Sequence, residues 1–288
     1  MASQQAAIIE EERFEGFPES CWERELHAAS PLFEVCARKP TIEGERKIIK
    51  NYWEDRAATF GDHTMAPERW AALIQYQVRT AGLGDAKLDV LDAGCGTGAI
   101  SMAVAAYGHR VTGIDLAQNM VDRACENARA AGVEARFLAG DGCHLPFADE
   151  SFDLVVNRNV LWGLVEPESA LAEWKRVLKP GGMLVYFDSE WYGYLNDEGR
   201  DLKRRAYYGK GTSRTYDVLE SAVWDLPLTF EKRPNWDVSH LADLGFCGVS
   251  AENVSAFVWD EEQRRTFSFA PQFMVKAVKP KTDAAPFC

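Results

Sequence analysis

The stretch VLDAGCGTGAIS, residues 90–101, joins a short apolar run to a segment of helical composition. Asp92 precedes three glycines at alternating positions, Gly94, Gly96 and Gly98. Glycines at such a junction let the backbone turn tightly, let bare N–H groups approach a ligand, and let the following helix pack on the strand. The stretch therefore predicts a strand, a ligand-binding loop and a helix in succession.

A second acidic residue, Asp115, stands at the end of the next apolar run, where its carboxylate can accept both hydroxyls of a ribose. Two cofactor classes fit these residues. Gly94, Gly96 and Ala99 with Asp115 satisfy the loose dinucleotide fingerprint, which favours NAD(P). Asp92, just before the first glycine, favours a ligand that carries an ammonium group, because a pyrophosphate gains nothing from a carboxylate there.

The surrounding sequence alternates short apolar runs with stretches of helical period. The runs span residues 88–93, 109–115, 135–141, 152–157 and 182–188. A helix at residues 236–246 and two closing strands, in residues 246–255 and 267–279, follow further on. Such alternation is typical of a doubly wound α/β fold with a mostly parallel, seven-stranded sheet.

Composition limits the function classes. The 288 residues carry a formal net charge of −12, which disfavours a role dominated by binding nucleic acid or an anionic membrane surface. The seven cysteines are odd in number and show no C-x-x-C spacing, which favours reduced thiols and a cytoplasmic location. The N-terminus lacks the pattern of a signal peptide, and no apolar stretch is long enough to span a membrane.

With these motifs, the sequence resembles the class I S-adenosylmethionine-dependent methyltransferases, similar to the ubiquinone and menaquinone type, from about Tyr52 to Lys279. The resemblance implies a Rossmann-like fold and S-adenosyl-L-methionine as cofactor, with S-adenosyl-L-homocysteine as product. The segment RVLKPGGMLVYFD, residues 176–188, resembles the helix, turn and fifth strand of the family. The implied cofactor residues are Asp92, Gly94, Gly96 and Gly98 by the methionine part, Asp115 and Leu116 at the ribose, Asp141 and Gly142 at the adenine, and Asn157 through its backbone.

Two further segments are open to more than one interpretation. NYWEDRAATFGD, residues 51–62, resembles the segment that closes over the cofactor, so Tyr52, Trp53 and Arg56 are lid candidates. Alternatively, this helix packs its aromatic residues into the core. In NRNVLWGL, residues 157–164, Arg158, Asn159 and Trp162 are candidates for contact with the methyl acceptor, or the segment only caps the next helix.

The acceptor itself is expected at an inserted flap, residues 189–235, which is rich in aromatic side chains such as Tyr192 and carries basic residues between Lys203 and Arg214. An aromatic cage, a basic site for an anionic acceptor, and a small helical subdomain with its own core all fit this composition. His63 and His144 are candidates for a general base at the methyl group, although a lone histidine is more often structural.

The absence of certain patterns narrows the expected chemistry. The place after the fourth strand reads Asn-Arg-Asn-Val rather than the Asn/Asp-Pro-Pro-aromatic motif of base-amine methyltransferases, and it offers no carboxylate for a metal. We therefore expect metal-free, in-line methyl transfer to a small-molecule acceptor, with no nucleic-acid or membrane partner and an oligomeric state that the sequence leaves open. An NAD(P)-binding oxidoreductase and a noncatalytic scaffold or sensor remain the alternatives.

The expected domain organisation follows from these segments. An N-terminal helical cap occupies residues 1–60, and the Rossmann-like core occupies residues 61–188 and 236–280. The acceptor flap, residues 189–235, is inserted between the two parts of the core, and residues 281–288 form a tail.

Overall fold

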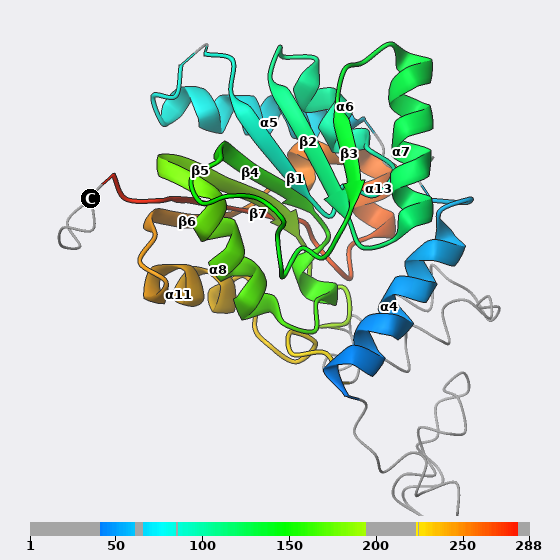
Figure 1. The fold of residues 1–288 in the computed structure, drawn as a ribbon. Helices are drawn as coiled ribbons and strands as arrows, with labels where there is room; N and C mark the ends of the chain where they lie inside the picture. Colours follow the sequence, from blue (N-terminus) through cyan, green and yellow to red (C-terminus); the bar gives the residue numbers. More distant parts are fainter. Residues whose placement is uncertain (1–40, 61–65, 85, 194–222, 224, 282–288) are drawn as a thin grey trace, which may run out of the picture.

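The computed structural model describes residues 41–60, 66–84, 86–193, 223 and 225–281. Its centre is one seven-stranded sheet in the order β3-β2-β1-β4-β5-β7-β6 (Figure 1). The strands are β1 (Asp89–Ala93), β2 (Arg110–Asp115), β3 (Arg136–Ala139), β4 (Phe152–Arg158), β5 (Leu178–Asp188), β6 (Cys247–Asn253) and β7 (Phe273–Val278). Neighbours from β3 to β5 pair in parallel, and β7 pairs antiparallel with both β5 and β6. The predicted mostly parallel α/β sheet is confirmed.

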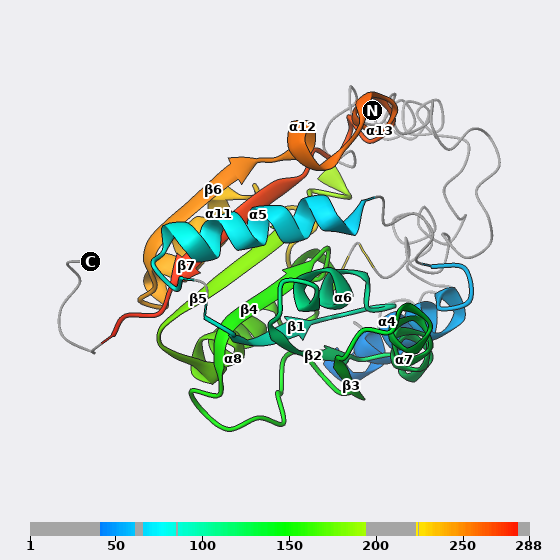
Figure 2. The same ribbon diagram turned by 90° about the horizontal axis from the view of Figure 1, so that it is seen from above.

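Helices cover both faces of this sheet. They are α4 (Ile42–Arg56), α5 (Pro67–Thr80), α6 (Ala99–Ala105), α7 (Gln118–Ala131), η1 (Leu161–Gly163), α8 (Pro167–Val177), α11 (Asn235–Asp243), α12 (Ser255–Val258) and α13 (Glu261–Thr266). One core cluster joins α8 and α11 to the sheet through Leu171, Trp174 and Leu241. The other joins α5 and α6 through residues such as Trp70 and Ile100, and Figure 2 shows α5 lying along the sheet. Because the central strands are buried on both faces, they appear in the sequence as continuous apolar runs.

Local signals in the sequence explain several element ends. The apolar stripe of α7, Met120, Ala124 and Ala128, is buried, and the helix stops at Gly132 in the left-handed conformation, with φ +66°. Pro167 begins α8, a position where proline is favoured because its missing N–H would have no partner within the helix. One boundary was wrong: of the predicted closing strand at 267–279, only Phe273–Val278 is a strand. The residues before it belong to a connection that also contains α12 and α13.

Parts of the expected organisation lie outside the described residues. These are residues 1–40 of the cap, His63, residues 194–222 of the flap with its basic residues, and most of the tail. Among the described helices, none is long and apolar enough to cross a membrane. Among the cysteines that the structure describes, Cys95, Cys125 and Cys143 are free thiols.

Candidate functional site

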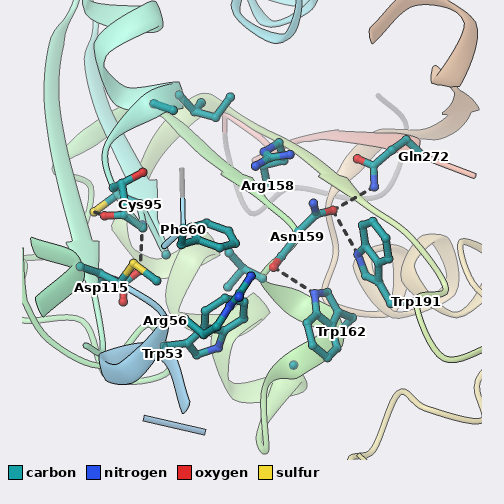
Figure 3. Close-up of a pocket in the computed structure, with 18 of the residues that line it drawn as sticks. Trp53, Arg56, Phe60, Cys95, Asp115, Arg158, Asn159, Trp162, Trp191 and Gln272 are labelled. Carbon is teal, nitrogen blue, oxygen red and sulfur yellow. Dashed lines mark hydrogen bonds between the residues drawn. The ribbon is translucent and has the colours of Figure 1, made fainter. Parts of the chain in front are cut away.

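A cavity of about 790 Å³ lies beyond the carboxyl ends of β1, β2 and β4. Ligands in open α/β sheets bind at this edge, where strand order reverses, and cavities of this size suit small molecules. Its walls come from the glycine loop after β1, the end of β2, helix α4, the segment after β4, and the connection between β6 and β7 (Figure 3).

The glycine loop forms one wall of the cavity and packs closely against Val160. Gly94 has φ +87°, and a Cβ placed on it would stand 2.4 Å from Cγ2 of Val160. The N–H groups of Gly94 and Cys95 donate to the Ile114 carbonyl at 2.7 and 3.0 Å, which ties the loop to β2. Gly94 and Gly96 line the cavity, but Gly98 does not; a Cβ there would meet Ala124 and Phe137 at 3.1 Å, so its role is to pack α6 against its neighbours.

Gly94→Ala is expected to lower the free energy of unfolding by about 2 to 4 kcal/mol, because it adds a clash with Val160 to the cost of a left-handed alanine. Gly84→Ala is the matched control: Gly84 has φ +68°, and a Cβ added there meets nothing within 4 Å, so only the backbone cost of about 1 kcal/mol applies. Urea unfolding of both variants measures the difference. An equal loss of unfolding free energy in the two variants would mean that the close contact between Gly94 and Val160 does not restrict the side chain at this position.

Asp115 links the glycine loop to the end of β2. Its Oδ2 accepts from the Gly96 N–H at 2.8 Å and its Oδ1 from the Ala117 N–H at 3.0 Å. Burial raises the pKa of this carboxyl, although these backbone donors oppose the rise. Asp115 and its neighbour Leu116 both line the cavity. A carboxylate has lone pairs for further donors, so Asp115 can still accept ribose hydroxyls as the sequence predicts.

The buried Asp92 and the partly buried Arg158 carry opposite charges, and both line the cavity. Asp92 is 1% exposed and accepts from the Ser101 hydroxyl at 2.5 Å. Burial raises the pKa of Asp92 to about 6, and the Asp115 charge adds to the rise. Burial lowers the pKa of Arg158 to about 10 against the attraction of Asp92, and its guanidinium stands 5.2 Å from the centre of the Trp70 ring. Arg158, predicted to contact the acceptor, thus lies beside the expected methionine site.

The raised pKa of Asp92 makes the affinity for a cationic ligand depend on pH. Below about pH 6 the cofactor-free carboxyl is protonated, and a cation that needs the ionised form must displace that proton. We expect the dissociation constant of S-adenosylmethionine to rise about tenfold per pH unit below that point and to level off above it. Calorimetry from about pH 5 to about pH 7.5 tests this dependence. The Asp92→Asn variant should bind S-adenosylmethionine weakly, with a dissociation constant that does not change with pH. A wild-type dissociation constant that is equally independent of pH would contradict the expectation.

Helix α4 forms the wall opposite the sheet. Tyr52, Trp53 and Arg56 all line the cavity, and the Trp53 ring meets Phe60 edge-on with centroids 5.3 Å apart. Tyr52 is also 6% exposed and packs in a small cluster with Ile49, so it belongs to the core as well as to the cavity wall, and its lid role stays a prediction. The Arg56 Nε is buried without a hydrogen-bond partner, which leaves a donor for an anionic ligand group.

Two polar contacts attach α4 to the rest of the protein. The Glu54 carboxylate accepts from the Gln118 and Asn119 N–H groups, at 2.9 and 2.8 Å, and so satisfies the first turn of α7. At the other end, Arg46 contacts the Asp141 carboxylate at 3.3 Å and also pairs with Glu166. These contacts join α4 to the residues that follow β2 and β3.

The remaining predicted residues separate into two groups. Asp141 and Gly142 line the cavity, and Asp141 Oδ1 accepts from the Cys143 N–H at 2.8 Å. His144 does not line it: its side chain is 65% exposed and contacts Asp141 Oδ2 at 3.2 Å, so the structure does not place it at the methyl group. Asn157 is fully buried beneath the cavity, with neither side-chain polar atom hydrogen-bonded, and does not line it.

The far end of the cavity is aromatic, and most of it was missed in the sequence. Trp162 and Tyr192, both predicted, line it with ring centroids 5.4 Å apart. Sequence reasoning assigned no role to the connection between β6 and β7, because part of it was interpreted as a strand. That connection contributes many lining residues: Trp259, Asp260, Glu262, Gln263, Thr266, Phe267, Phe269 and Gln272.

This sheet order, with a glycine loop and a strand-end acid on one cavity, defines a Rossmann-like protein that binds a nucleoside cofactor. Comparison with known proteins identifies the family. A family described as "Methyltransferase domain" matches residues 91–186. The chain is 35% identical over 211 residues to 27-O-demethylrifamycin SV methyltransferase of Amycolatopsis mediterranei, covering 72% of this chain and 68% of that one. The chain belongs to the S-adenosylmethionine-dependent methyltransferases, whose methyl donor is S-adenosylmethionine.

Other similarities are more partial. The malonyl-[acyl-carrier protein] O-methyltransferase of Erwinia pyrifoliae is 47% identical over 146 residues, but the match spans only 53% of that protein and 49% of this chain. Among solved structures, phosphoethanolamine N-methyltransferase 2 of Haemonchus contortus, in complex with S-adenosylhomocysteine, superposes with a TM-score of 0.55 at 16% identity. That match covers 81% of this chain and 60% of the other, and it shows the shared fold. An NAD(P) oxidoreductase or a noncatalytic scaffold receives no support from these relatives.

Proposed function

We propose that the protein transfers the methyl group of S-adenosylmethionine to a small-molecule acceptor. One observation carries the proposal: a single cavity joins the glycine loop and Asp115, at one end, to an aromatic wall that includes Trp162 and Tyr192, at the other. A cofactor on the first wall and an acceptor on the second would share one enclosed space. The cavity volume of about 790 Å³ is consistent with two small molecules rather than a macromolecular surface.

The residues that fit the cofactor are those with free capacity on the cavity wall. Asp115 would accept the ribose hydroxyls, Asp141 the adenine amine, and Arg56 would donate to the methionine carboxylate. When bound, S-adenosylmethionine supplies a methyl group made electrophilic by the sulfonium. The protein then needs mainly to orient the acceptor and exclude water, which can account for several kcal/mol of the barrier without a dedicated base.

The first test is binding, followed by a search for the acceptor. Calorimetry should detect the binding of S-adenosylhomocysteine at micromolar to low millimolar concentration. The absence of a binding heat across this concentration range would contradict the proposal. Incubation with a metabolite extract and S-adenosylmethionine carrying an isotopically labelled methyl group should place the label on a small molecule. Label found only on protein or nucleic acid would contradict the small-molecule acceptor, which is supported by the rifamycin-modifying relative.

We also propose the cytoplasm as the compartment, in line with the free thiols of Cys95, Cys125 and Cys143. Recovery of the protein only from a secreted fraction would contradict this. The division into a cap, a core and an acceptor flap remains a proposal as well, and limited proteolysis that cuts within residues 194–222 and leaves the sheet intact would support it.

A further inference from the structure

A hydrogen-bonded group of two amides and an indole lies at the aromatic end of the cavity (Figure 3). Asn159 follows β4 directly, Trp191 follows β5, and Gln272 precedes β7. All three line the cavity, so segments up to 113 residues apart meet here. Asn159 has φ +57°, a left-handed conformation that asparagine adopts more readily than most residues and that is enriched at functional sites.

The orientation of both amides is fixed by donors and acceptors of unambiguous type. The Trp191 indole N–H can only donate, and it donates to Asn159 Oδ1 at 3.3 Å. Gln272 must therefore turn its NH₂ group toward the same oxygen, at 2.9 Å. The Ser189 hydroxyl donates to the carbonyls of Ala270 and Pro271, so it accepts the second N–H of Gln272.

This arrangement leaves one donor and one acceptor unused. Gln272 is 1% exposed, and its buried Oε1 has no hydrogen-bond partner within the described part of the chain. The Asn159 Nδ2 donates to no group among the described residues, and the residue is only partly buried. A buried carbonyl oxygen without a partner costs free energy, and a ligand that donates to it recovers that cost. A hydroxyl both donates and accepts at the same atom, so a single hydroxyl can meet this donor and this acceptor together.

The walls around this pair suit a flat ring. The Trp162 indole donates to the Asn159 carbonyl at 3.0 Å, which holds its ring beside the amide, and Tyr192 lies against it. On the other side, Trp191 meets Phe267 and Phe269 edge-on, with centroids 6.3 and 6.4 Å apart. Aromatic faces bind planar rings through stacking and edge contacts.

We propose that Asn159 and Gln272 bind a hydroxyl group on a planar aromatic acceptor, with Asn159 Nδ2 donating to the hydroxyl oxygen and Gln272 Oε1 accepting its proton. Trp191 is the positioning residue that sets the orientation of both amides. The inference rests on the proposed function, since it names the acceptor class of the same cavity, and it predicts a neutral phenol-like acceptor rather than an anionic or aliphatic one.

The test compares two probes of the same shape, 1-naphthol and naphthalene, by equilibrium dialysis with protein saturated by S-adenosylhomocysteine. We expect 1-naphthol to bind at least about tenfold more tightly. In Asn159→Asp, which keeps the oxygen for Trp191 and Gln272 but loses the donor, 1-naphthol affinity should fall about tenfold while naphthalene affinity and the melting temperature stay unchanged. Asn253→Asp, on the exposed end of β6, is the matched control for the added charge and should change nothing.

Equal affinity of the two probes for the wild-type protein would overturn the inference even if the variant failed to fold. An equal loss for both probes in Asn159→Asp would overturn it too, because it would report a distorted cavity rather than a lost hydrogen bond. Failure of the proposed function is visible separately, as absent binding of S-adenosylhomocysteine before either probe is added.

Discussion

Replacing Arg233 by methionine is expected to lower the free energy of unfolding by about 3 to 5 kcal/mol. The Arg233 guanidinium, 1% exposed, lies between two fully buried carboxylates: it donates to Asp188 at 2.8 Å and to Asp237 at 2.9 Å. Tyr186 donates to Asp237 as well, at 2.6 Å. Burial alone would lower the pKa of Arg233, but the two carboxylates outweigh it and hold the pKa above its ordinary range. Methionine fills similar space and leaves both carboxylates without their cation.

Urea unfolding with a two-state fit measures this loss, and an unchanged m-value would show that the folded and unfolded states keep their compactness. Arg123→Met is the control, because Arg123 contacts Glu126 at 3.3 Å in an exposed i,i+3 pair worth about 0 to 1 kcal/mol. A loss no larger than the control would contradict the expectation. Asp188 Oδ2 also accepts from the backbone N–H of Trp162 at 3.0 Å, so the Arg233→Met variant should disturb the aromatic wall too.

Asp115→Asn is expected to weaken the binding of S-adenosylhomocysteine by about a hundredfold. Hydrogen bonds to a charged group contribute about 1.5 to 3 kcal/mol each, and the asparagine would replace a carboxylate that accepts from the Gly96 N–H and that we propose accepts from two ribose hydroxyls. Calorimetry gives the dissociation constant. Asp122→Asn, on the exposed surface of α7, is the matched control and should bind as the wild type does.

The stability of the Asp115→Asn variant distinguishes a lost contact from misfolding. Since burial raises the pKa of Asp115 in the folded protein, its ionised form costs stability at neutral pH, and that cost disappears as the pH falls below the raised pKa. The neutral amide removes this cost, but its NH₂ group faces one of the two backbone N–H donors that Asp115 accepts, so the two effects oppose each other and the variant should melt close to the wild-type temperature at pH 7. Unchanged cofactor affinity would remove Asp115 from the ribose site, whatever the melting temperature.

The fold and the cofactor wall were predictable because their signals are local. The apolar runs of β1 and β4, such as Val90–Leu91 and residues 154–156, are buried on both faces and are therefore continuous in the sequence. The glycines and Asp92 adjoin one strand, and Asp115 ends the next, so parallel pairing of β1 with β2 brings them to one edge. Short-range patterns were sufficient here.

Trp162 and Tyr192 of the proposed acceptor wall were predicted, but the part of that wall between β6 and β7 and the buried ion group could not be predicted in the same way, since they depend on contacts between distant residues. Arg233 and Asp188 are 45 positions apart, and neither stands in a pattern that indicates a buried pair. Gln272 lies in a stretch that alternates like a strand, yet it turns out of the sheet to reach Asn159. His144 follows a predicted cofactor residue by three positions, but its side chain faces solvent because Asp141 holds it at the surface.

The origin of the cavity walls has a consequence for protein engineering. The cofactor side comes from segments between parallel strands, where a changed loop would disturb the order of the sheet. Much of the acceptor side comes from one connection, residues 254–272, between the antiparallel neighbours β6 and β7. Such a connection leaves and re-enters the sheet at adjacent positions, so its length and sequence can vary independently of the rest. Grafting this single segment between related enzymes is therefore a route to exchanging acceptor preference while cofactor affinity is retained.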